Sequence, residues 1–363
     1  MLPTLLARRL RVLVCLATLV SARIAGAQTP ESTGVRAQGL AGAFVAIADD
    51  VTATYWNPAG LSNAPLFDAT LQRSVLSNPF DRAGRVPSDG GTSSASTFLA
   101  FAIPSFGVSV LRTVTLTSLP PTAWAADSRQ QDRPGGAVVS RMVTTALGAT
   151  LVQSLTGHLV AGTTVKAVRG SFGTAPTTAD TLSDALDEAG ELSAPSVTRF
   201  DVDAGVLGWA GSVRLALAAR NLLAPRFSTG RDDGSQPAWK VGRTERQVRA
   251  GIAITPGFAI GRTAAAKPTL TISVDADLLR TSLPTGDERH LAAGIERWIG
   301  KRLALRGGAR VNTVGDVRPV IAAGVGVAPW SRLSFEAFAG SGSASDRGPA
   351  GGFNWGAAAR VSF

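Results

Sequence analysis

Apolar and polar residues alternate along much of the second half of the chain. In residues 353–363, Phe353, Trp355 and Val361 fall on one side of an extended strand, whereas Asn354 and Arg360 fall on the other. Successive side chains of a strand point to opposite faces, so this stretch has one apolar and one polar face. Residues 270–278 and 303–311 alternate in the same way. The pattern is noisier in the first half, where Arg112 lies on an otherwise apolar face.

Clusters of Gly, Pro, Ser and Asp divide the chain from residue 66 onward into short stretches with strand character. An even number of strands is predicted, fourteen in all. They span residues 66–76, 95–104, 106–117, 138–154, 158–171, 196–209, 213–221, 246–258, 268–279, 289–298, 301–311, 317–329, 332–340 and 353–363.

The lengths of the connections favour a membrane barrel over a soluble β-sandwich. Alternation alone fits both, since a sandwich also buries one face of each sheet. However, the long connections, such as 77–94, 118–137, 172–195 and 222–245, all fall at one end of the sheet, and the short ones fall at the other. Bacterial outer-membrane barrels combine short periplasmic turns with longer outer loops in this way. We therefore predict an all-β fold, a 14-stranded antiparallel transmembrane β-barrel.

The charge content agrees with a barrel that is surrounded by hydrocarbon. Charged residues make up 17% of the chain, compared with about a quarter in a typical soluble domain. A basic residue on the lipid face of a barrel costs roughly 2 to 4 kcal/mol at mid-depth, so the polar strand faces should turn inward. The charged residues expected inside are Arg199, Asp201, Asp203, Arg214, Arg220, Arg249, Asp275, Asp277, Glu296, Arg306, Arg310, Glu336 and Arg360.

Residues 1–27 have the features of a cleaved signal peptide. Basic residues come first, then nine apolar residues from Val12 to Val20, and Ala25-Gly26-Ala27 supplies a small-residue cleavage site. The only cysteine, Cys15, lies in this segment. Without its four arginines the formal charge falls from +10 to +6. No basic stripe with aromatic partners is present, so nucleic-acid binding is not expected. We predict export to the outer membrane.

Residues 34–61 differ in composition from the rest of the chain. Leu40, Phe44, Ile47, Ala48 and Val51 recur at helical spacing, which predicts a short amphipathic helix. We expect residues 28–64 to form a helical or irregular N-terminal plug (hatch), followed by the barrel at 65–363. The candidate motif residues of the plug are Gly39, Gly42, Asp49, Asp50, Asn57, Pro58 and Ala59.

This segment resembles the N-terminal hatch of the FadL-type outer-membrane transport superfamily. The resemblance rests on a glycine-rich start, an Ala-Phe-Val-Ala-x-Ala-Asp-Asp stretch and the Asn57-Pro58-Ala59 motif. It implies a plugged 14-stranded barrel that moves hydrophobic, fatty-acid-like molecules across the outer membrane. The superfamily also contains PorV/PorQ-like proteins, which carry or anchor exported proteins, and that role stays open for this chain.

Several further expectations concern ligands and partners. Arg214, Arg249, Arg306 and Arg310 are candidate lumen residues for a carboxylate ligand, the alternative being a lattice of ion pairs that fills the lumen. The terminal Phe363 resembles the signal that the barrel-assembly machinery reads. Neither a metal site nor a cofactor is expected, and no nucleophile–base constellation suggests an enzyme. The expected partners are membrane lipids and a hydrophobic small molecule.

Overall fold

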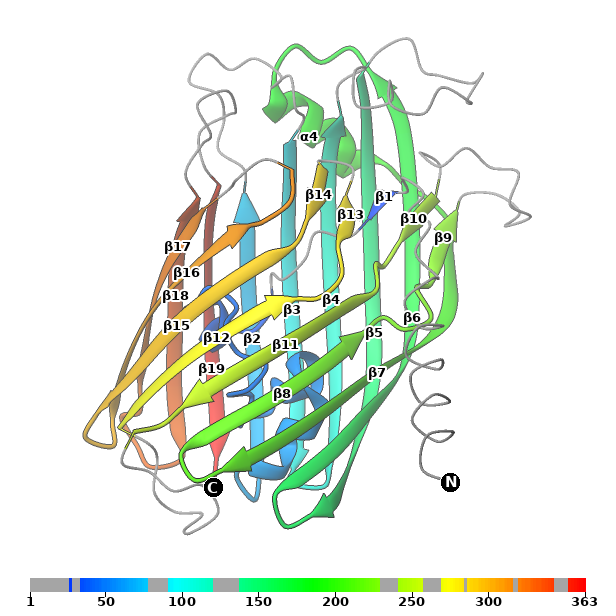
Figure 1. The fold of residues 1–363 in the computed structure, drawn as a ribbon. Helices are drawn as coiled ribbons and strands as arrows, with labels where there is room; N and C mark the ends of the chain where they lie inside the picture. The colour runs from blue at the N-terminus through cyan, green and yellow to red at the C-terminus, as the bar shows by residue number, and fades with distance from the viewer. Residues whose placement is uncertain are drawn as a thin grey trace.

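Fourteen strands among the described residues close into an antiparallel barrel in this computed structural model (Figure 1). The structure describes residues 26–27, 33–77, 91–119, 137–228, 241–256, 269–283, 286–315, 319–342 and 352–363. All fourteen predicted strands are present, with ends shifted by a few residues. They are β2 (Asp68–Ser77), β3 (Gly91–Ile103), β4 (Phe106–Leu119), β5 (Ala137–Thr156), β6 (Leu159–Thr177), β7 (Ser196–Ala210), β8 (Val213–Arg220), β11 (Gln247–Ile254), β12 (Leu270–Asp277), β15 (His290–Ile299), β16 (Leu303–Asn312), β17 (Val320–Val327), β18 (Leu333–Gly342) and β19 (Phe353–Ser362).

The strand β19 closes the barrel by pairing with β2 from Phe353↔Ser77 to Ser362↔Asp68. Each neighbouring pair in the ring is antiparallel. Because β19 pairs with β2, the ring of fourteen strands has no open strand edge. Closure satisfies the backbone groups that an open sheet would expose to lipid. The predicted fold class is confirmed.

The strand faces are oriented as the charge argument predicts. On β3 the outward Leu99, Phe101 and Ile103 are exposed, whereas the inward Phe98 and Ala100 are buried. The carboxylates of Asp201, Asp275 and Glu296 lie on inner faces, and each of these residues is at most 1% exposed. No helix among the described residues is long and apolar enough to span a bilayer.

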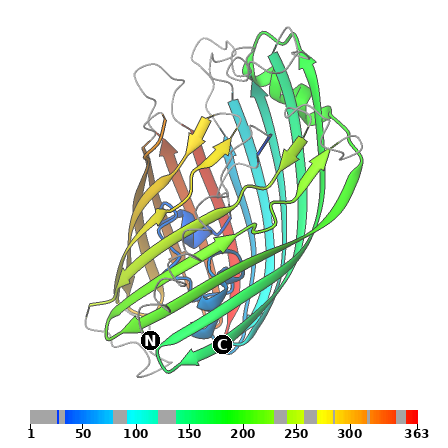
Figure 2. The same cartoon turned by 45° about the vertical axis from the view of Figure 1, so that its right-hand side comes forward.

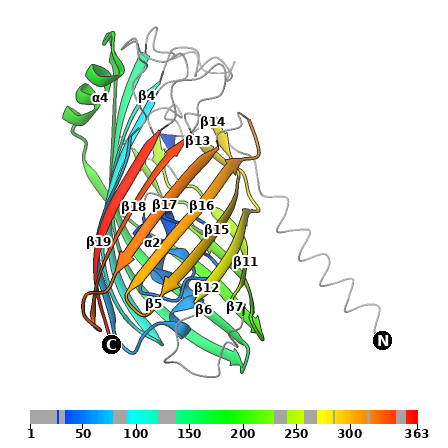
Figure 3. The same cartoon turned by 90° about the vertical axis from the view of Figure 1, so that its left-hand side faces the viewer.

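Additional elements lie at the end of the barrel opposite the C-terminus (Figures 1 and 3). The helix α4 (Leu182–Glu191) packs Ala185 and Ala189 against Val139, on the outer side of the wall. Two small sheets form there as well, one from β1 (Gly26–Ala27), β9 (Arg226–Ser228) and β10 (Val241–Arg243), the other from β13 (Thr281–Leu283) and β14 (Gly286–Glu288). The sequence interpretation missed all of these elements: it treated the segments of α4, β9, β10, β13 and β14 as loops and placed Gly26–Ala27 at the end of the signal peptide.

Residues 33–64, called the plug below, lie inside the barrel (Figure 2). They form α2 (Val35–Gln38), α3 (Ala53–Trp56) and the 3₁₀ helix η1 (Pro58–Asn63). The amphipathic helix predicted over residues 40–51 is wrong. Ala41 and Gly42 have φ values of 54° and 89°, a left-handed conformation that a right-handed helix does not continue through. This stretch forms turns, and its apolar residues are buried on all sides, not only along one helical stripe.

Glycines on the inner face of the wall allow the plug backbone to approach. A Cβ added at Gly162 would lie 2.4 Å from the Ala59 nitrogen, and one added at Gly308 would lie 2.3 Å from the Leu40 carbonyl carbon. Real Cβ atoms do not come this close to backbone. The wall is therefore shaped around the plug, and part of the high glycine content has this packing role.

Candidate functional site

Wall side chains satisfy the hydrogen bonds of the irregular plug backbone. The Asp275 carboxylate accepts from the backbone nitrogens of Phe44 and Val45, both at 2.7 Å, and the Asp68 carboxylate accepts from the nitrogen of Val51 at 2.7 Å. Buried backbone groups outside regular structure need such partners, because an unpaired one costs about as much as a lost hydrogen bond. The plug is thus bonded to the wall through polar groups as well as packed against it.

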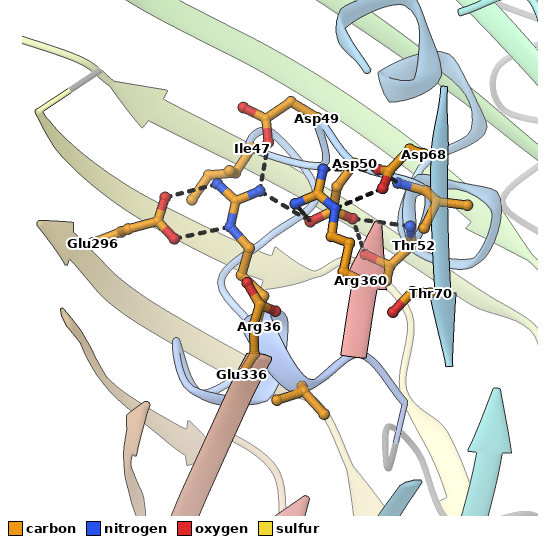
Figure 4. Close-up of polar contacts among 12 residues, drawn as sticks. Arg36, Ile47, Asp49, Asp50, Thr52, Asp68, Thr70, Glu296, Glu336 and Arg360 are labelled. Carbon is orange, nitrogen blue, oxygen red and sulfur yellow. Dashed lines mark hydrogen bonds and ion pairs between the residues drawn. The ribbon is translucent and has the colours of Figure 1, made fainter. Parts of the chain in front are cut away.

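A buried ion-pair chain joins the plug to three wall strands, and Figure 4 shows its Arg36–Glu296 pair. Arg36 of the plug donates to both oxygens of Glu296, from Nε at 2.8 Å and from Nη2 at 2.7 Å. Glu296 also accepts from Arg306 Nε at 2.7 Å, and Arg306 Nη2 donates to Glu336 at 3.0 Å. The paired geometry of Arg36 and Glu296 is the bidentate form that holds a guanidinium most firmly. We call these four residues the ion-pair lock.

A second set of ion pairs starts from the two aspartates of the plug (Figure 4). Asp49 accepts from Arg36 Nη1 at 2.6 Å, and Asp50 accepts from the same nitrogen at 3.0 Å. Arg360 on β19 binds Asp68 at 2.6 Å through Nε and lies 3.9 Å from Asp50. Burial alone would raise the pKa of the Asp50 carboxyl, but the charges of Arg360 and Arg36 outweigh it and hold that pKa below its ordinary value.

The Asn-Pro-Ala motif anchors the other end of the plug. The fully buried Asn57 donates from Nδ2 to the carbonyl oxygens of Val45 and Val206, at 3.0 and 3.3 Å, and its Oδ1 accepts from the Ala59 nitrogen at 3.2 Å. Asn57 is extended, as expected before proline, and Pro58 begins η1. The motif therefore fixes a change of chain direction against β7.

The remaining motif residues also lie at contacts with the wall. Gly39 packs against Gly324, where an added Cβ would come within 3.1 Å of the partner Cα. The carbonyl oxygen of Gly42 accepts from Arg249 Nη1 at 3.4 Å. Their positions suit the plug function expected from the sequence, which stays a proposal.

The structure separates the four candidate lumen arginines into two groups. Arg306 belongs to the ion-pair lock, Arg214 donates to Asp49 and to the Ile47 carbonyl, and Arg249 pairs with Asp277 at 2.7 Å. These three meet the plug or its partners. Arg310 is half-buried on the same inner face of β16, farther toward the loop end. Ligand binding by these residues stays a prediction.

A cavity lies between the plug and the wall of β3 to β8. Its cavity volume is small, about 60 Å³. One part of its lining is apolar, with Phe98, Leu111, Ala146 and Val168 from the wall. An apolar wall beside a few polar groups is the lining typical of small-molecule sites, but the closed space is smaller than the roughly 300–1,000 Å³ of such sites, so a ligand enters only when the lining moves.

The polar end of the cavity carries both signs of charge. Lys166 contacts Asp203 at 2.7 Å and Asp201 at 2.9 Å, and the Arg220 guanidinium stacks 4.4 Å from the ring centre of Tyr55. Sequence reasoning placed Asp203 and Arg220 inside but missed Lys166. Its signal was present, because it shares the strand face of Thr164 and Val168, but alternation on β6 is weak. We take this cavity, with the plug beneath it, as the candidate binding site.

No group of three or more His, Cys, Asp and Glu side chains is arranged to hold a metal ion within the described part of the chain. His290 instead lies 3.3 Å from Asp277, and His158 packs near Trp209.

Solved structures of outer-membrane channels share this fold at low sequence identity. The toluene transporter TodX of Pseudomonas putida gives a TM-score of 0.62 at 12% identity, over 94% of this chain and 100% of that chain. The monoaromatic hydrocarbon channel CymD gives 0.60 at 12% identity, over 92% and 98%. A FadL homologue of Pseudomonas aeruginosa gives 0.57 at 13% identity, over 93% and 100%. The FadL-type fold predicted from the Asn-Pro-Ala segment is confirmed, while membership of the PorV/PorQ-like branch stays a prediction.

Comparison of sequences identifies the family. No curated protein sequence matches the chain. A family model with the description "F plasmid transfer operon, TraF, protein" matches residues 91–277, from the start of β3 to the end of β12. This stretch contains the walls of the cavity and exceeds half of the chain. The protein therefore belongs to the TraF family of that description.

Proposed function

We propose that the protein is an outer-membrane channel that passes hydrophobic small molecules, with the cavity as its binding site and the plug as its gate. The observation that carries the proposal is the cavity itself, which sets an apolar wall of four side chains beside a polar end inside a closed barrel. The names of the structural neighbours, a toluene transporter and a monoaromatic hydrocarbon channel, support the same class of cargo.

The polar end favours a cargo with one polar group, such as a fatty acid. Lys166 and Arg220 are cationic donors, and the apolar residues of the lining lie on the neighbouring strands. A carboxylate would accept charge-assisted hydrogen bonds from Arg220, since Lys166 is already held by Asp201 and Asp203, while its hydrocarbon part contacts Phe98 and Leu111. A purely hydrocarbon cargo would use the apolar wall alone.

Filling the cavity tests the proposal. Ala146→Trp places a large ring in the cavity, and Leu147→Trp places the same ring on the outer face of the same strand, where Leu147 is 53% exposed. We expect the first variant to lower binding of a fluorescent fatty acid and uptake of radiolabelled toluene at least tenfold, and the second to leave both unchanged. Equal binding and uptake by the two variants would refute the cavity as the site.

A charge substitution separates the two classes of cargo. Arg220→Gln should weaken binding of the fatty-acid probe about tenfold and leave toluene uptake unchanged, because only the carboxylate uses the cation. Loss of both would indicate a structural role for Arg220. Loss of neither would exclude the carboxylate contact and leave a hydrocarbon cargo.

A further inference from the structure

A row of arginines and threonines crosses the outer face of six neighbouring strands, β2 to β7. The residues are direct cross-strand partners in the antiparallel registers. In order across the wall they are Arg73, Thr97, Arg112, Thr145, Arg169 and Thr198. We call this set the arginine row.

The arginine row points away from the lumen. Arg73, Arg112 and Arg169 are exposed, and the residues before and after each of them turn inward or are more buried. Arg73 donates to the Thr97 hydroxyl at 2.7 Å, and Arg169 donates to Ser196 at 2.9 Å. Among the described residues, none of the three is paired with a carboxylate. This distinguishes them from the inward-facing Arg214, Arg249 and Arg306, which pair with carboxylates.

The wall between the row and the short-turn end of the barrel, where the C-terminus lies, is apolar. The outward residues there include Leu99, Phe101 and Ile103 on β3 and Leu147 and Leu151 on β5, each between 43% and 65% exposed. From Thr145 to Leu155, β5 advances by about 34 Å at 3.4 Å per residue, which is about 26 Å of height for a strand tilted by about 40°. An apolar band about 25 Å tall is the usual lipid-facing zone of such barrels, so the row lies near its edge.

On β3 to β6, the wall on the other side of the row is covered by α4. The helix packs on outward residues of β4, β5 and β6, with Leu116, Val139 and Ala175 in contact with it. Arg141, four residues before Thr145 on the same face of β5, donates to the Leu192 carbonyl at the end of this helix. The row thus lies between the apolar band and a region shielded by its own helix, at the level where lipid headgroups meet the protein.

The cost of unpaired cations on the lipid side points to their partner. Three arginines at mid-depth would each cost roughly 2 to 4 kcal/mol, whereas at the interface this falls to about 0–1 kcal/mol. Neighbouring arginines are two strands apart, about 10 Å, so the long side chains can reach a group between them. Guanidinium groups bind phosphate oxygens in a bidentate way, and the threonine hydroxyls add donors.

We propose that the arginine row binds the phosphate groups of lipid headgroups in the surrounding outer leaflet. The proposal rests on the membrane insertion assumed by the proposed function, and it adds a lipid site on the wall that is separate from the cavity. The alternation of arginine and threonine gives three cationic positions along one line across the wall, which suits a lipid with phosphate monoester groups better than a neutral headgroup.

Lipid titration of the detergent-purified protein tests this. Native mass spectrometry would count bound phosphatidic acid and, in parallel, phosphatidylcholine. The variant Arg73→Gln, Arg112→Gln, Arg169→Gln removes the row. A matched variant, Arg297→Gln, Arg302→Gln, Arg332→Gln, removes three exposed arginines from the opposite, short-turn end. The single variant Arg112→Gln serves if the triple one does not fold.

We expect the parent and the matched variant to bind phosphatidic acid at least tenfold more tightly than phosphatidylcholine. The row variant should lose this preference, and Arg112→Gln should reduce it about threefold. Unchanged preference in the row variant would overturn the proposal, as would displacement of phosphatidic acid by equimolar inorganic phosphate. Binding of the fluorescent fatty acid in the cavity is measured on the same samples. Its loss with an intact lipid preference would count against the proposed function alone.

Discussion

Removing one charge from the ion-pair lock should release the plug. Glu296 is 1% exposed and accepts hydrogen bonds from Arg36 and Arg306 at 2.7 to 2.8 Å. The substitution Glu296→Gln keeps its shape but leaves two buried guanidinium groups with one negative partner fewer. Breaking a buried ion pair by removing one partner typically costs about 3–5 kcal/mol. We take the lower end, about 3 kcal/mol, because glutamine still accepts one hydrogen bond.

A cysteine in the plug measures this effect. The chain has a single cysteine, Cys15, so a Cys15→Ser background carrying Ala46→Cys reports on the plug alone. Ala46 is fully buried and lies against Gly251 of the wall. Opening of the plug exposes the thiol to a maleimide. A change of about 3 kcal/mol corresponds to a rise of about a hundredfold in the labelling rate.

Two controls decide how the result is interpreted. Glu191→Gln removes an exposed carboxylate of α4 and should leave the labelling rate unchanged. Arg36→Gln combined with Glu296→Gln should label less than the product of the two single effects, because the pair is then removed together. A Glu296→Gln rate within twofold of the parent would refute the idea that the ion-pair lock holds the plug.

Two further predictions use the same reporter. Gly162→Ala should raise the labelling rate of the Ala46→Cys reporter about tenfold, because the new Cβ would lie 2.4 Å from the Ala59 nitrogen and overpacking typically costs about 1–3 kcal/mol. The control Gly157→Ala adds a Cβ in open space and should leave the labelling rate unchanged. Equal rates for the two variants would contradict the packing argument. The lowered pKa of Asp50 contributes stability that is present above the ordinary carboxyl pKa of 3.8 and is lost as the pH falls through the lower folded value. The labelling rate should therefore stay constant from pH 7 to about pH 5 and rise only below about pH 4. A rise near pH 6 would show that another group controls the plug, and Asp50→Asn should remove the acid-dependent step.

Strand positions could be predicted from the sequence because each wall strand must present lipid and lumen to alternate residues. This constraint acts on every strand separately, so a pattern such as that of Leu99 to Ile103 needs no knowledge of the partner strand. The lengths of the loops then indicated which end of the barrel carries the short turns and which end carries the long loops. The helix α4 was missed because a connection was expected to lack structure, although Thr181 caps its start by accepting from the Asp184 nitrogen at 3.1 Å.

The plug and the site could not be predicted to the same depth. Arg36 and Glu296 are 260 positions apart, and no local pattern shows that they meet. The turns at Ala41 and Gly42 are set by wall groups such as Asp275 and Arg249. The helical spacing of apolar residues in the plug therefore did not indicate a helix. The conformation of the plug depends on long-range polar contacts with the wall more than on the intrinsic helix propensity of its residues.

The position of the lumen arginines links the proposed gate to the proposed binding site. While the plug is in place, Arg306 is held by two glutamates, Arg214 by the plug carbonyl of Ile47, and Arg249 by Asp277. A carboxylate that reached these arginines would have to replace partners that are already buried and paired, which costs several kcal/mol. In this state the accessible site is therefore the cavity above the plug. Under the proposed function, the deeper arginines would bind cargo only after the plug has moved, and the charges that hold the plug would then line the path.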